Sequence, residues 1–147
     1  MAGCERKVSR AETPKAKGAS RREDPDSYLQ MYPSWRFSNC DSDRWGFDKG
    51  NLSECFWEEI FPFLKSLEKQ KWSEILVGSK KKNHSIKVED LNTVARKRLE
   101  SRQIETDALV SIRLQGKHRL YGLMFDGVFH ILWFDKDHGD NQDCVCR

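Results

Sequence analysis

The dipeptide Asp126-Gly127 constrains the fold of this chain more than any other feature of its sequence. It stands between two runs rich in apolar and aromatic residues, 117–125 and 128–135. A type I′ turn needs positive φ at both central positions, and Asp-Gly meets that need more easily than most dipeptides. The two runs are therefore predicted to form an antiparallel β-hairpin.

A two-residue loop also predicts the register of this hairpin, because side chains directly opposite each other share a face. It pairs Tyr121 with Leu132 and Arg119 with Phe134. One face, predicted to be the helix-covered core, then holds Leu120, Gly122, Met124, Phe129, Ile131 and Trp133. The other, predicted to be mixed in character, holds Arg119, Tyr121, Leu123, His130, Leu132 and Phe134.

The residues before the hairpin predict an α+β domain. Residues 34–38 alternate polar with aromatic side chains, and residues 110–114 alternate apolar with polar ones, as strands do. Apolar residues recur with helical spacing over 56–67 and again over 91–99. We therefore expect a short N-terminal strand, two helical segments, and a three-stranded antiparallel sheet ending in the hairpin.

Local signals refine the first helical segment. Asn51 is predicted to start it, because Glu54 follows three residues later as in a capping box. Pro62 lacks an amide hydrogen and crowds the preceding turn, so the helix should kink there or split, with Pro62 opening the second part. Residues 78–84 are predicted to form a polar basic loop.

Charge and composition divide the chain into a disordered basic arm, residues 1–27, and a single domain, residues 28–147. The arm lacks aromatic residues, and residues 1–24 carry seven Lys or Arg against four Asp or Glu. The rest of the chain has equal numbers of basic and acidic residues. This balance argues against a domain that grips nucleic acid through its whole surface.

Two further signals bear on location. No apolar run approaches the roughly 20 residues of a membrane span, and no signal-peptide stretch follows Met1. The five cysteines are not spaced like a secreted disulfide scaffold. We therefore expect a cytoplasmic protein with reduced thiols and no membrane partner.

Basic residues concentrate in one part of the domain. Residues 80–102 carry eight Lys or Arg against three acidic residues. Together with cations on the later strands, they supply candidate RNA-binding residues, unless they are simply solvated. These candidates are Lys80, Lys81, Lys82, Arg96, Arg113 and Lys117.

The layout of residues 34–138 resembles the RelE/YoeB superfamily of bacterial toxins. The resemblance rests on the order of elements, on the string His118-Arg119-Leu120-Tyr121 ahead of the hairpin, and on the late His138. It implies a small α+β endoribonuclease that cleaves messenger RNA without a cofactor or metal. It also implies RNA or the ribosome as a partner, and an antitoxin-like protein.

Carried over by position, the resemblance makes Arg119 the phosphate-stabilising residue and His138 the late catalytic histidine. Tyr121 and His130 complete the candidate catalytic set, although His130 is also suited to simple packing. Cleavage by the 2′-hydroxyl needs a base, a cation on the developing phosphorane and an acid for the leaving oxygen. The alternative is a non-catalytic binding module that uses the mixed sheet face for a protein or nucleic-acid partner.

Overall fold

The predicted hairpin lies at the centre of the sheet in the computed structural model, which describes residues 27–77, 82–138 and 144–146. It joins β4 (Arg119–Phe125) to β5 (Val128–Asp135). Asp126 and Gly127 both have positive φ, 53° and 81°, as a type I′ turn requires. The hairpin prediction is confirmed.

The hairpin belongs to a five-stranded mixed sheet with the order β1-β5-β4-β3-β2. The short strand β1 (Ser34–Arg36) pairs in parallel with β5, and β3 (Ala108–Arg113) pairs antiparallel with β4. The α+β class is therefore confirmed, with more strands in the sheet than the sequence predicted.

The strand that the sequence analysis missed is β2 (His84–Lys87), which pairs antiparallel with β3 at one edge of the sheet. Its residues are His, Ser, Ile and Lys, of which Ile86 alone is apolar. An edge strand can be this polar because one side of it meets solvent. Because β2 lacks an apolar pattern, its residues did not indicate a strand. The predictions of a loop through His84 and of only three antiparallel strands in the sheet were therefore wrong.

The hairpin register is also corrected. Pairing follows the prediction from the turn as far as Gly122, but a bulge then shifts it between Gly122 and Tyr121. Tyr121 consequently lies opposite Trp133 rather than Leu132, and Arg119 lies opposite Asp135 rather than Phe134. A bulge inserts one unpaired residue, so the predicted faces of Trp133 and Phe134 are exchanged.

The first helical segment changes from π-helix to α-helix beside Pro62, while the backbone stays helical at Ile60 and Phe61, so Pro62 opens the second part without the chain leaving the helix. A π-helix (Phe56–Ile60) is followed by α2 (Phe61–Leu67), and Pro62 lies in the first turn of α2. The preceding short helix α1 (Lys49–Leu52) is capped by the Asp48 side chain, which accepts a hydrogen bond from the backbone of Asn51. The predicted start at Asn51 was wrong, because its side-chain amide donates instead to the carbonyls of Gly46 and Phe134.

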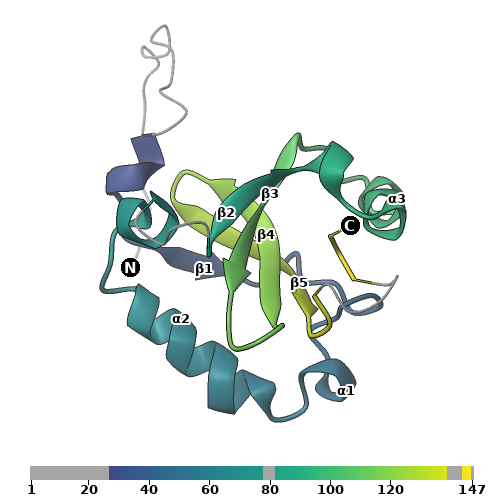
Figure 1. Ribbon diagram of the computed structural model, residues 1–147, viewed down its shortest axis with the longest axis horizontal. Coiled ribbons are helices and arrows are strands. Elements are labelled where there is room, and N and C mark those ends of the chain that lie inside the picture. The colour runs from purple at the N-terminus through teal and green to yellow at the C-terminus, as the bar shows by residue number, and fades with distance from the viewer. Residues whose placement is uncertain (1–26, 78–81, 139–143, 147) are drawn as a thin grey trace, which may run out of the picture.

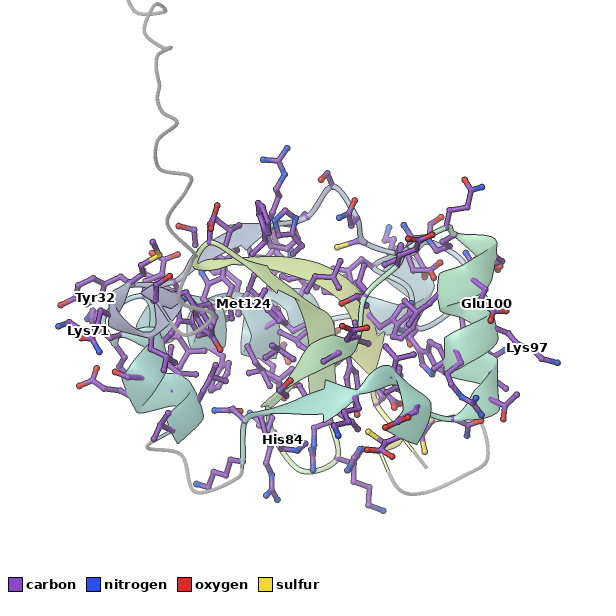
Figure 2. The ribbon with its side chains drawn as sticks, turned by 90° about the horizontal axis from the view of Figure 1, so that it is seen from above. Tyr32, Lys71, His84, Lys97, Glu100 and Met124 are labelled. Carbon is purple, nitrogen blue, oxygen red and sulfur yellow. The ribbon has the colours of Figure 1, made fainter. Side chains whose placement is uncertain are left out.

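The second helix, α3 (Thr93–Ser101), begins at an Asn92 cap and buries Ala95 and Leu99 as its spacing predicted. Figure 2 shows Lys97 and Glu100 on the side of α3 that faces away from the sheet. The other short helices among the described residues are the 3-10 helices Ser27–Gln30 and Val88–Asp90 and the π-helix Ser73–Val77.

The sheet lies between two helical layers, with α2 on one side and α3 on the other (Figures 1 and 2). The α2 side encloses an apolar core that includes Ile60, Leu64, Ile112, Leu120 and Phe134. The α3 side encloses a second core that includes Leu91, Leu99, Tyr121, Trp133 and Val145.

This second core corrects the prediction of a mixed face open to partners. The segment Cys144–Cys146 covers part of it, since Cys146 forms an isolated antiparallel bridge with Leu91 and the Val145 carbonyl accepts from Asn92 N at 2.8 Å. Most of the face is therefore buried. Exposed cations remain at both ends of this face: Arg113 lies opposite Arg119 at one end, and Arg36 lies opposite His130 at the other.

Residues 1–26 of the expected arm lie outside the described residues, and Ser27 opens a 3-10 helix. Within the described part of the chain, no helix has both the length and the apolar character needed to cross a membrane.

Candidate anion-binding site

Two neighbouring rows of side chains cross the sheet on the face that α3 covers. Residues of a row are direct partners in the ladders, so their side chains share this face. The first row contains His84, Ser111, Tyr121 and Trp133. The second row, nearer the end of the sheet, contains Arg113, Arg119 and Asp135.

The two arginines are the main charges of the second row. Arg119 donates from one guanidinium nitrogen to the carbonyls of Gly116 and His118, at 2.8 and 3.0 Å. Burial lowers the pKa of Arg119, and the charge of Arg113 lowers it further. Within the described ranges, neither arginine forms an ion pair with a carboxylate.

Asp135 lies opposite Arg119 but does not neutralise it through a direct contact. Its side chain is buried and accepts hydrogen bonds from the backbone N–H groups of Asp137 and Val145, both at 2.9 Å. Burial raises the pKa of Asp135, against the effect of these two hydrogen bonds. Asp135 thus holds the backbone at Asp137 and Val145. The guanidinium groups of Arg113 and Arg119 stay available to an anion.

His138 is tied to this row through the buried Tyr121 hydroxyl. The Tyr121 Oη atom lies 3.3 Å from His138 Nδ1 and 3.0 Å from Cys146 Sγ. Burial raises the pKa of Tyr121, and it raises that of Cys146 as well, so both groups stay protonated at neutral pH. We refer to Arg113, Arg119, Tyr121 and His138 as the basic cluster.

The pKa of His138 is lowered, first by burial and then by the charge of Arg119. The imidazole is therefore mainly neutral at pH 7. The hydrogen bonds through Tyr121 can run in either direction, because the hydroxyl and the thiol each donate and accept. His138 can accordingly hold its proton on Nδ1 or on Nε2, which suits a group that both removes and returns a proton.

Three of the four predicted catalytic residues, Arg119, Tyr121 and His138, thus come together. The fourth, His130, pairs with Leu123 in β4 and Arg36 in β1 near the hairpin turn, and its ring lies 6.5 Å from that of Phe125. It makes no contact with the basic cluster among the interactions of the described residues, which agrees with a packing role.

The predicted RNA-binding residues are more scattered. Arg113 belongs to the basic cluster, and with the exposed Lys82 it lines a cavity of about 610 Å³ between α2 and the end of β3. Lys117 is exposed, and its carbonyl accepts from the His138 N–H at 3.3 Å. Arg96 lies on α3, where it donates to Thr93. Lys80 and Lys81 lie outside the described residues.

Sequence reasoning missed His84 and Cys146. His84 reaches the cluster only because β2 pairs with β3, and it contributes to the lowered pKa of His138. Cys146 reaches it because the chain returns to Leu91 after β5. A weak signal for β2 was the apolar Ile86 between polar neighbours, which is too short a pattern to predict a strand.

Comparison of the chain with protein-family models, with curated proteins and with solved structures found no significant match. The function must therefore be argued from the basic cluster itself.

Proposed function

We propose that this protein is a small endoribonuclease of bacterial toxin type, which cleaves messenger RNA without a metal in its reaction. The observation that carries the proposal is the basic cluster: two arginines without an ion-pair partner among the described residues, next to a histidine whose pKa is lowered. Such a group of side chains can bind a phosphodiester and move a proton beside it.

In the proposed reaction, the 2′-oxygen of a ribose attacks the adjacent phosphorus. His138 takes the 2′-hydroxyl proton, and Arg119 and Arg113 stabilise the negative charge of the phosphorane. The bond from phosphorus to the 5′-oxygen breaks, the leaving 5′-oxygen takes a proton from water, and His138 returns its proton to the resulting hydroxide. The products are a 2′,3′-cyclic phosphate and a free 5′-hydroxyl.

Tyr121 is assigned a positioning role in this reaction. Its buried hydroxyl holds His138 Nδ1 and leaves Nε2 to face the substrate. Lys82 and Lys117 are assigned to the phosphates that flank the cleaved bond. The proposal places the enzyme in the cytoplasm, with the ribosome presenting the message and an antitoxin-like protein covering the basic cluster.

The test uses the purified chain with single-stranded RNA, both free and on translating ribosomes, in the presence of a metal chelator. We expect cleavage with cyclic phosphate ends, loss of cleavage in Arg119→Ala and His138→Gln, and no cleavage where the attacking ribose is 2′-deoxy. The matched control is Arg36→Ala, an exposed strand arginine at the hairpin turn end of the sheet.

Two results would count against the enzyme. A folded wild-type protein that cuts neither form of RNA removes the proposal, and so does a folded Arg119→Ala protein with full activity. If the RNA is bound in a salt-sensitive way but stays intact, the cluster is a phosphate-binding surface and the chain is a binding module.

A further inference from the structure

A second group of reactive side chains lies on the opposite face of the sheet. Cys55 immediately precedes the π-helix Phe56–Ile60, Glu59 lies in that helix, and His118 immediately precedes β4. One possible ligand atom from each residue lies within 4.8 Å of the other two. In the described ranges, no other three His, Cys, Asp or Glu side chains meet in this way.

Local backbone structure aims the first two side chains at the third. Cys55 and Glu59 are four residues apart on a helical segment, so they lie on the same side of it. His118 and Arg119 are neighbours in sequence and point to opposite faces. The His118 ring packs edge-on against Phe134 at 5.3 Å, whereas Arg119 faces the basic cluster.

The carboxylate at the centre of the group is buried and held at both oxygens. Glu59 is 9% exposed. Its Oε1 atom lies 2.7 Å from His118 Nδ1, and its Oε2 atom accepts from the Gln115 backbone N–H at 2.8 Å. A ligand whose orientation is fixed by a backbone hydrogen bond is typical of protein metal sites.

We propose that Cys55, Glu59 and His118 bind a zinc-class divalent ion through one thiolate, one carboxylate and one imidazole. Zinc takes sulfur at about 2.3 Å and nitrogen or oxygen at about 2.0 to 2.2 Å in a tetrahedral arrangement. Such bonds place neighbouring ligand atoms about 3.3 to 3.6 Å apart. The 2.7 Å distance between Glu59 and His118 therefore opens slightly on binding.

The donor set selects the class of metal. Thiolate and imidazole favour zinc and similar transition metals over Ca²⁺ or Mg²⁺, which prefer oxygen ligands. Binding displaces the thiol proton of Cys55 and the proton shared between Glu59 and His118. Three protein ligands leave a fourth position for water, and the half-exposed Cys55 and His118 side chains give the ion a path from solvent.

The bound ion would join the π-helix to the turn before β4. The His118 carbonyl accepts from the Arg119 guanidinium at 3.0 Å. The metal thus holds the residue that orients Arg119, without taking part in chemistry at the basic cluster. It stabilises the fold because it binds the assembled site and not the separated ligands.

The test is titration of the metal-free full-length chain, kept reduced, with Co²⁺ and then Zn²⁺. We expect one equivalent of Co²⁺ to produce a thiolate-to-cobalt charge-transfer absorption, Zn²⁺ to abolish that absorption, and Zn²⁺ to raise the Tm. Cys55→Ser should lose the absorption, and His118→Gln should lower Co²⁺ affinity by more than about tenfold.

The matched control is Cys40→Ser, because Cys40 is a half-buried thiol outside the group, and burial raises its pKa to about 12. This variant should bind Co²⁺ as the wild type does. Circular dichroism checks that each variant is folded, and His118→Gln serves if Cys55→Ser does not fold. A folded wild-type chain without the absorption, or an absorption unchanged in Cys55→Ser, would overturn the proposal.

Discussion

Asp41 and Arg98 form a two-pronged ion pair that joins the loop after β1 to helix α3. Arg98 Nε and Nη2 each donate to one oxygen of the Asp41 carboxylate at 2.8 Å. The Asp41 side chain is fully buried, and it also accepts from the Trp133 indole at 3.0 Å. One carboxylate therefore connects a loop, a helix and the central hairpin.

Replacing Asp41 with Ala should lower the free energy of unfolding by about 2 to 4 kcal/mol, because the Arg98 charge and the Trp133 N–H lose their partner. Urea denaturation measures this loss. The control is Asp43→Ala, since the Asp43 side chain is 78% exposed at 3.5 Å from Arg98. That change should alter stability by less than about 0.5 kcal/mol. Equal losses in the two variants would refute the structural role of Asp41.

The same carboxylate predicts a dependence of stability on pH. Burial alone would raise the pKa of Asp41, but hydrogen bonds from Arg98 and from the backbone of Asp43 more than offset this and lower it well below its usual range. The resulting stability is present above the unfolded pKa of about 3.9 and is lost as pH falls toward the folded value. Tm should therefore drop more in the wild type than in Asp41→Asn between about pH 6 and pH 3. Parallel curves for the two proteins would contradict the prediction.

Gly122 is expected to resist substitution, because an added Cβ would collide with the His130 carbonyl oxygen across the bulge. Gly122→Ala should destabilise the protein by about 3 kcal/mol, a typical penalty for overpacking. Gly116→Ala is the comparison, since its Cβ would meet no atom within 4 Å and only the positive φ of 53° opposes it. That strain costs about 1 to 2 kcal/mol. Thermal unfolding measures the loss of stability in each variant. A loss in Gly122→Ala no larger than that in Gly116→Ala would contradict the steric collision.

Removing the charge of Arg119 should raise the pKa of His138 toward its ordinary value. Burial remains the larger cause of the lowered pKa, so the return is partial in Arg119→Gln. NMR titration of the histidine ring protons measures the change directly. Arg36→Gln removes a charge near the hairpin turn and should leave the His138 titration unchanged. An unaltered His138 pKa in Arg119→Gln would contradict the prediction that the Arg119 charge lowers it.

Tyr121→Phe removes the hydroxyl between His138 and Cys146 and keeps the buried ring. We expect a loss of about 1 kcal/mol in unfolding free energy, as for one hydrogen-bonding group. RNA cleavage should fall more than RNA binding, because the His138 ring loses its orientation. The control is Tyr32→Phe, whose side chain is 57% exposed. Unchanged cleavage by a folded Tyr121→Phe protein would remove the positioning role.

Features that depend on near neighbours in the chain were predicted well from the sequence. The Asp126-Gly127 turn, the helix boundary at Pro62 and the buried Ala95 and Leu99 of α3 each follow from one short stretch of residues. Backbone dihedral preferences and helical spacing act over only a few residues, so these elements needed no knowledge of the rest of the fold.

Features that depend on contacts between distant segments were decided by the tertiary structure. The bulge at Tyr121 places Trp133 in the second core, and the polar strand β2 exists because β3 offers it an edge. The candidate sites also depend on such contacts. Cys55 and Glu59 come from the π-helix and meet His118, which lies far along the chain before β4. Local propensity carries no information about such pairings; they arise where packing and hydrogen bonding bring separate segments together.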